Sequence, residues 1–177
     1  MNTFAPNTEI VLRDANGNVK PLFNSNALGK VTGLRIPGVT GSFKNSLLNH
    51  NLVTNAGHKA ANAKISGQGS YGTFTTIALG IGATAAATAD TQLGSEITTG
   101  GAARQVATGI SQVTTSVTND TTQLVSTFNF TASFAVTEEG ILDSTTVSGS
   151  TLLAHQVFGA INVNSGDSLT ITHKYQS

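Results

Sequence analysis

The sequence contains no cysteine and no tryptophan, and charged residues make up only 10% of its 177 residues. Without cysteine, neither disulfides nor thiolate-bound metal ions can contribute to the structure. A typical soluble domain has about 25% charged residues. Here nine basic and nine acidic residues cancel, so the chain has no basic excess for binding nucleic acid or an anionic membrane. A net charge near zero also removes the repulsion between copies and favours self-association.

Long apolar runs are also missing. The alanine-rich stretch at 82–89 is far shorter than the roughly 20 apolar residues of a membrane-spanning helix. The first residues lack a basic region followed by an apolar run, so we expect no secretory signal. We therefore expect a protein that is made in the cytoplasm and has neither a membrane nor a nucleic acid as its partner.

Residues 1–50 differ in pattern from the rest of the chain. Two apolar runs, at 9–13 and 19–20, flank the dipeptide Asn16-Gly17, which supplies the positive φ of a hairpin turn. From 24 to 43, isolated apolar residues alternate with glycines and a proline, which argues against a regular element. We predict a hairpin followed by an extended N-terminal arm that is anchored on a partner. Its predicted partner-contact residues are Phe4, Ile10, Leu12, Val31, Leu34 and Ile36.

One short helix is predicted at about 54–66. Thr54 is a suitable N-cap, small apolar residues such as Ala60 recur at helical spacing, and Gly67 follows the last turn. The predicted apolar face consists mainly of alanine, so we expect this helix to lie flat against a sheet.

After residue 70 the apolar residues follow the period of two that is typical of strands. The run at 124–136 places three phenylalanines on one face, and its length exceeds that of a usual strand, so we expect it to bend or to cross between sheets. The polar opposite faces of several runs favour antiparallel pairing. Residues 51–177 are thus predicted to form a mainly β domain, an antiparallel, jelly-roll-like β-sandwich. Its predicted core residues are Leu124, Phe128, Phe130, Phe134, Phe158, Leu169 and Ile171.

Two patterns that can carry chemistry do not have the context that the chemistry needs. Residues 67–72 match the dinucleotide pattern G-x-G-x-x-G, but the predicted helix precedes them and a strand follows, the reverse of the order that binds a pyrophosphate. Glu138 and Glu139 are neighbours in a strand and point to opposite faces, so they cannot act as a catalytic pair. We expect these two glutamates at a solvated strand end.

The histidines do not form a recognisable metal site either. None of them makes the i, i+4 pair or the H-x-H spacing that prepares a metal site, although a threefold axis could gather one histidine from each subunit. The last one falls on the apolar face of a strand, where a hydrogen-bonded core or interface histidine is expected. The four are His50, His58, His155 and His173. We expect no catalytic residue, no metal and no cofactor.

Six stretches carry a resemblance to a known family: NLVTNAG (51–57), TIALGIGAT (76–84), DTQLGSEI (90–97), FAVTEEGIL (134–142), LLAHQVF (152–158) and GDSLTIT (166–172). In order and spacing they resemble a widespread family of small structural proteins of tailed-phage virions. Members are described as head decoration (cement) proteins or as tail-fibre associated. The resemblance concerns residues that make the fold, so it carries no functional site to this chain.

The resemblance implies a virion component without deciding which one. The low charge, the extended arm and the lack of a catalytic set of residues favour a non-enzymatic capsid decoration protein on the virion surface. Its expected partners are the major capsid protein and further copies of itself, with a homotrimer as the expected assembly. The alternative is a tail-fibre or baseplate adaptor that recognises a host surface or its glycans. Glycan recognition needs exposed aromatic side chains, and the chain offers two tyrosines, Tyr71 and Tyr175. An enzyme such as a depolymerase is the third reading.

Overall fold

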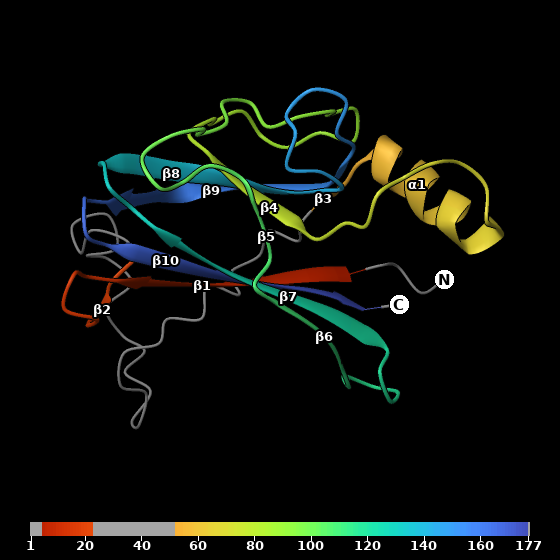
Figure 1. Ribbon diagram of the computed structural model, residues 1–177, viewed down its shortest axis with the longest axis horizontal. Coiled ribbons are helices and arrows are strands. Elements are labelled where there is room, and N and C mark those ends of the chain that lie inside the picture. The colour runs from red at the N-terminus through yellow and green to blue at the C-terminus, as the bar shows by residue number, and fades with distance from the viewer. Residues whose placement is uncertain (1–4, 23–51, 177) are drawn as a thin grey trace.

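Two antiparallel five-stranded sheets and one short helix make up the part of the chain that the computed structural model describes, residues 5–22 and 52–176. Sheet A has the strand order β2-β1-β10-β7-β6 and sheet B the order β3-β9-β8-β4-β5. The sheets face each other as two layers, with helix α1 beyond one end (Figure 1). The predicted mainly β, antiparallel sandwich with one short helix is confirmed.

The elements have these bounds. Sheet A contains β1 (Ala5–Arg13), β2 (Val19–Lys20), β6 (Gly109–Val113), β7 (Thr121–Asn129) and β10 (Ser168–Gln176). Sheet B contains β3 (Leu52–Val53), β4 (Thr76–Gly80), β5 (Gln105–Val106), β8 (Phe134–Leu142) and β9 (Leu152–Val163). The helix α1 spans Asn55–Ser66. It is too short to cross a membrane, and no helix in the described part of the chain is long and apolar enough to do so.

The N-terminal hairpin is an integral part of sheet A. Gly17, with φ of 82°, closes the turn between β1 and β2, as the Asn-Gly dipeptide predicts. Strand β1 then pairs with β10 over its full length. Consequently the boundary predicted at residue 50 does not separate an arm from a domain, because β1 lies inside the sandwich. Residues 23–51 connect β2, at the edge of sheet A, to β3, at the edge of sheet B.

This position of β1 corrects part of the predicted partner surface. Ile10 and Leu12 point into the core and are 4% and 1% exposed. They cannot contact a partner, because alternation along the paired strand places them between the two sheets. The other predicted partner-contact residues, Phe4, Val31, Leu34 and Ile36, lie outside the described residues.

The long apolar run crosses from one sheet to the other, as expected. Strand β7 ends at Asn129 in sheet A, and β8 begins at Phe134 in sheet B. Phe130 lies in the crossing and is 2% exposed, with its ring 6.1 Å from that of Phe134. One alternating pattern therefore serves both layers, because the face that points inward stays inward while the chain changes sheets.

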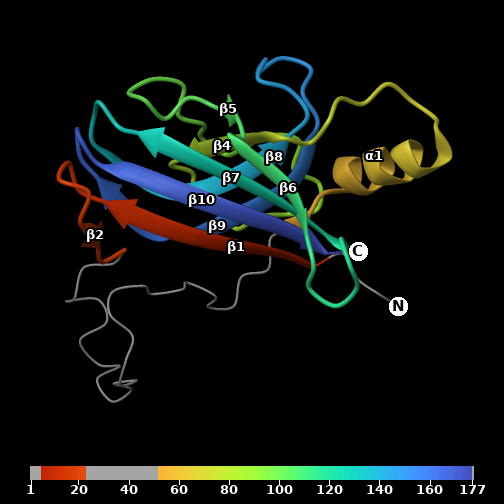
Figure 2. The same cartoon turned by 60° about the horizontal axis from the view of Figure 1, so that its bottom comes forward.

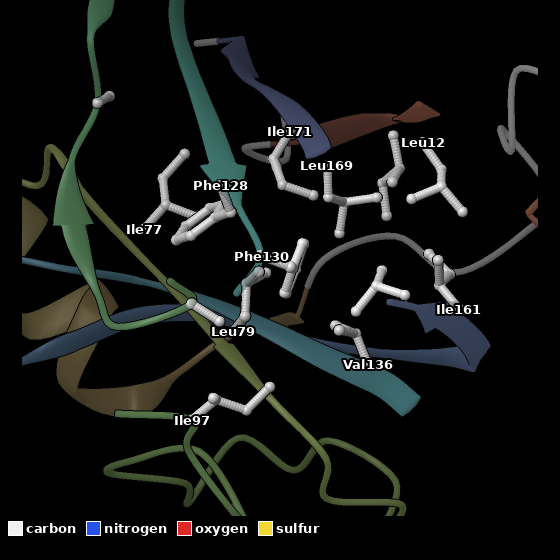
Figure 3. Close-up of a cluster of buried hydrophobic side chains, with 14 of the residues drawn as sticks. Leu12, Ile77, Leu79, Ile97, Phe128, Phe130, Val136, Ile161, Leu169 and Ile171 are labelled. Atoms are coloured by element: carbon white, nitrogen blue, oxygen red, sulfur yellow. The ribbon is translucent and has the colours of Figure 1, made fainter. Parts of the chain in front are cut away.

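The hydrophobic core lies between the two sheets. Among the predicted core residues, Phe134 and Phe158 are partly buried and pack against the core, while the other five are at most 2% exposed: Leu124, Phe128, Phe130, Leu169 and Ile171. Sheet B supplies the facing aliphatic side chains (Figure 3), among them Ile77, Leu79, Val136 and Ile161.

The helix begins and ends where the sequence predicts. The Thr54 hydroxyl accepts the N–H of Gly57 at 2.9 Å and donates to the carbonyl of Leu152 at 2.5 Å, so one residue caps α1 and ties it to β9. Gly67, with φ of 68°, ends the helix. A Cβ at Gly57 would lie 2.3 Å from the carbonyl oxygen of Leu153. Close packing on β9 therefore explains a glycine that costs about 1 kcal/mol of helix propensity.

A matched pair of glycines tests how the loop after Ile97 packs. Gly101 and Gly149 share a φ of +79°, but a Cβ at Gly101 would lie 1.9 Å from the carbonyl oxygen of Asn129, whereas Gly149 has nothing within 4 Å. We expect Gly149→Ala to lower the free energy of unfolding by about 1 kcal/mol through backbone strain alone. Gly101→Ala should cost about 1–3 kcal/mol more, measured by urea denaturation. Equal losses would contradict the packing of this loop against the crossing between sheets.

Candidate functional site

The outer face of sheet B is covered by two loops, 81–104 and 143–151, which lie above β4, β8 and β9 in Figure 1. A second, smaller apolar cluster fills the space beneath them: Ala78, Leu93, Leu142 and Leu152, all at most 3% exposed. This face of the sandwich is therefore occupied by the chain's own loops.

Glu138, on the outer face of β8, holds the first of these loops in place. Its Oε1 accepts the backbone N–H groups of Gly82 at 2.8 Å and Ser95 at 2.7 Å. Its Oε2 accepts the N–H of Gly94 at 2.9 Å and lies 3.0 Å from Nε2 of His155. The glutamate is fully buried. Both of its oxygens thus have two hydrogen-bond partners, which a buried carboxylate requires.

The electrostatics of this network favour the charged carboxylate. Burial would raise the pKa of Glu138, but the N–H groups of Ser95, Gly94 and Gly82, together with His155, outweigh it and hold the pKa below its ordinary value. Asp90 lies 2.7 Å from Nδ1 of the same histidine. Burial opposes its charge as well, yet the N–H of Ala87 and His155 lower the pKa of Asp90. Each of the two ring nitrogens of His155 therefore faces a carboxylate.

Two glycines make room for the Glu138 carboxylate. A Cβ at Gly80 or Gly82 would lie 2.3 Å or 2.5 Å from Oε1 of Glu138. This explains the sequence Gly80-Ile81-Gly82 at the end of β4. The expectation that Glu138 and Glu139 mark a solvated strand end is wrong, because both side chains are fully buried. They do point to opposite faces, as their adjacency predicts.

Glu139 points inward, into a polar cluster between the sheets. The Thr8 hydroxyl donates to Oε1 of Glu139 at 2.9 Å, and Nδ1 of His173 lies 3.1 Å from that hydroxyl and 3.2 Å from the same carboxylate oxygen. The His173 ring lies 4.6 Å from the Tyr175 ring. Burial, and then the charge of Glu139, raise the pKa of Tyr175 well above its ordinary value. His173 is a hydrogen-bonded core histidine, as its place on the apolar face predicts.

Among the residues that the structure describes, neither network shows the geometry of a nucleophilic relay. A hydroxyl–histidine–carboxylate relay uses one ring nitrogen for the nucleophile and the other for the acid. In the inner cluster, Thr8 and Glu139 both contact Nδ1 of His173. In the outer network, both nitrogens of His155 face carboxylates. These buried groups are arranged to hold loops and strands together.

A third polar contact joins the two covering loops. The Arg104 side chain, 4% exposed, forms an ion pair with Glu96. Its Nη1 also donates to the hydroxyl of Ser150 at 2.9 Å and to the carbonyl of Thr146 at 3.2 Å. The guanidinium suits this role because its fixed fork of donors can serve several acceptors at once.

The remaining sequence candidates are not brought together. His58 is exposed on α1, and His50 lies outside the described residues. Within residues 5–22 and 52–176, no group of three or more His, Cys, Asp or Glu side chains could hold a metal ion. The glycine pattern at 67–72 follows α1 and precedes β4, the order that does not place a phosphate at a helix N-terminus.

The outer face of sheet A differs from that of sheet B. The outward side chains of its three central strands, β1, β10 and β7, are at least partly exposed and mostly uncharged: Glu9, Val11, Arg13, Gln123, Val125, Thr127, Thr170, Thr172 and Lys174. The hydroxyls of Thr127 and Thr170 lie 2.9 Å apart across β7 and β10. We call this surface the open face. Its side chains are mostly uncharged, as are those at the cores of protein interfaces.

Comparison with protein-family models, curated proteins and solved structures gave no match.

The Glu138 network makes a prediction about stability. Glu138→Gln places an amide N–H₂ against backbone N–H donors, so we expect a loss of about 2–4 kcal/mol in the free energy of unfolding and faster hydrogen exchange at 81–97. Glu9→Gln, on a partly exposed residue of β1, is the matched control and should change stability by less than about 0.5 kcal/mol.

The same variant has an expected pH dependence. Because the folded-state pKa of Glu138 lies below its ordinary value of 4.5, its stabilising contribution is complete above that pH and is lost as the pH falls through the folded pKa. The stability difference between wild type and Glu138→Gln should therefore shrink on acidification. A difference that stays constant from pH 7 to pH 3 would contradict the charged network.

Proposed function

We propose that this chain is a non-enzymatic structural protein of a phage virion, which decorates the capsid by binding the lattice of the major capsid protein. The observation that carries the proposal is the contrast between the buried ionisable side chains and the mostly uncharged side chains of the open face. Glu138, Glu139, His155 and His173 are at most 3% exposed and hold the fold together, whereas the open face of sheet A presents mostly uncharged side chains. The cores of protein interfaces are depleted of charge in the same way.

The resemblance of residues 51–177 to virion structural proteins supports the same proposal. The resembling stretches include Gly80, Gly82, Ser95, Glu138 and His155, the residues that build the loop network over sheet B. These are fold-making residues, which agrees with a family that shares a scaffold. The proposal includes a position on the capsid surface of the virion, with further copies of the chain as an additional partner.

A tail adaptor that binds host glycans has less support. Tyr175 is 6% exposed and lies in the core, so of the two tyrosines only Tyr71 is partly accessible. Stacking of a sugar ring needs an exposed aromatic face. The described surface offers little of this kind, which favours a protein partner.

The number of copies per particle tests the location. In virions of the phage that encodes the chain, quantitative mass spectrometry should find hundreds of copies per particle, because a decoration protein follows the capsid lattice. A few copies or a few dozen would instead favour the tail. Absence from purified virions would overturn both readings.

Binding to capsids prepared without this protein tests the open face. We expect Thr172→Arg, on the open face, to weaken co-sedimentation with capsids at least tenfold, because a charge would be buried at the interface. Val147→Arg is the control, since Val147 is 57% exposed in the loop over sheet B. Equal binding of the two variants would contradict docking through this face.

The predicted arm can be tested in the same assay. Deleting residues 1–40 would remove β1 and with it a strand of the sandwich. Replacing residues 24–50 by a glycine–serine linker of equal length keeps β1, β2 and β3. We expect this variant to fold and to bind capsids more weakly than the wild type, because the predicted arm would contact the capsid. Unchanged binding would contradict that role of the arm.

A further inference from the structure

Strand β6 forms one edge of sheet A. It pairs with β7 through five residues, from Gly109↔Val125 to Val113↔Thr121, and Figure 2 shows it outermost in the row β1, β10, β7, β6. The other edge strands of the described sheets, β2, β3 and β5, have two residues each. Strand β6 is therefore the longest of the strands that end the order of a described sheet.

This edge lacks the features with which proteins protect such strands. Natural edge strands carry lysine, proline or bulges that prevent pairing with another chain. From Val106 to Asn119 the sequence has no charged residue and no proline, and the pairing of β6 with β7 is regular. Ile110, in β6, is 53% exposed, and Val106 and Val117, which precede and follow the strand, are 50% and 69% exposed. The edge thus combines exposed apolar side chains with backbone N–H and C=O groups that can pair with another strand.

The hairpin that presents this edge is held by Asp120. Its carboxylate accepts the backbone N–H groups of Val117, Thr115 and Ser116 at 2.8–2.9 Å. The hydrogen bonds from Val117 and Thr115 lower the pKa of Asp120 most. Gln176 of β10 donates to Ser116 at 3.0 Å. An edge that is ordered before association loses less conformational entropy when it pairs.

We propose that β6 pairs in an antiparallel manner with β6 of a second copy of the chain, so that the two A sheets become one continuous sheet. Such a contact is isologous and closes as a two-fold dimer. Pairing about Ser111 sets all five residues of each β6 opposite one another and brings the two Ile110 side chains to the same face as diagonal neighbours. The zero net charge of the chain leaves no overall repulsion to oppose the contact.

This contact specifies the self-association proposed above, and it does not depend on capsid binding. An antiparallel β6–β6 contact uses the same strand of both copies and closes with two of them. Two-fold pairing is therefore the arrangement that the geometry favours over a trimer. Its test uses the purified full chain alone, so its failure would leave the capsid proposal standing.

Sedimentation equilibrium of the wild type and of two matched variants tests the dimer. We expect a monomer–dimer equilibrium for the wild type and an increase of at least tenfold in the dissociation constant for Ile110→Lys, because two like charges would meet at the contact. Ile65→Lys makes the same chemical change on α1, where Ile65 is 83% exposed, and should leave the constant unchanged. A monomeric or trimeric wild type, or equal effects of the two variants, would overturn the proposal.

A cross-linking experiment gives an independent readout if Ile110→Lys disturbs folding. The chain has no cysteine, so a single introduced thiol reports one position. Directly opposed residues in antiparallel strands have Cα atoms about 4.5–5.5 Å apart, within the range of a disulfide. Ser111→Cys should form a disulfide-linked dimer under mild oxidation, whereas Ser165→Cys, in the exposed turn before β10, should not. Equal cross-linking of the two variants would refute pairing about Ser111.

Discussion

The buried carboxylate of Glu138 is the interaction on which the shape of the surface depends. A charged group without water must have all its hydrogen bonds supplied by the protein, and here three backbone N–H groups and one imidazole supply them. Their convergence fixes the loop at 81–97 over sheet B. Without this anchor, the apolar cluster of Ala78, Leu93, Leu142 and Leu152 would lose its cover. Hydrogen bonds within the chain therefore fix the cover of one face of the sandwich, whereas none of the described loops is anchored in this way over the outer face of sheet A.

Adjacent glutamates in β8 show why burial of charge was difficult to predict. Alternation along a strand correctly indicates that Glu138 and Glu139 point to opposite faces, but it does not indicate whether either face is covered. Two adjacent glutamates suggest a solvated strand end, because glutamate is seldom buried unless it is paired. The partners lie far away in the sequence: Gly82 and Ser95 for one glutamate, Thr8 and His173 for the other. The glycines that make room for Glu138 can be read in the sequence, but only the fold brings them next to its carboxylate.

Local sequence patterns predict those features of the fold that depend on neighbouring residues. The cap at Thr54, the turn at Gly17 and the alternation at 124–136 are set within a few residues, and the structure has them where they were expected. The place of β1 was not predicted, because a hairpin read alone looks the same whether it is isolated or inserted in a sheet. Its pairing with β10 joins residues more than 150 positions apart. Because of that distance, local sequence patterns do not show that Ile10 and Leu12 lie in the core.

The open face and the β6 edge belong to the same sheet, and this relation gives the two proposals a common consequence. If two copies pair through β6, their open faces become parts of one continuous surface, with twice the area and the same low charge. A surface of this kind can contact two neighbouring sites of a repeating lattice at once. The second contact then forms at the high effective concentration set by the first, so a weak affinity of each face is sufficient for stable attachment. Attachment that is weak for a monomer and strong for a dimer would suit the proposed decoration of a repeating lattice.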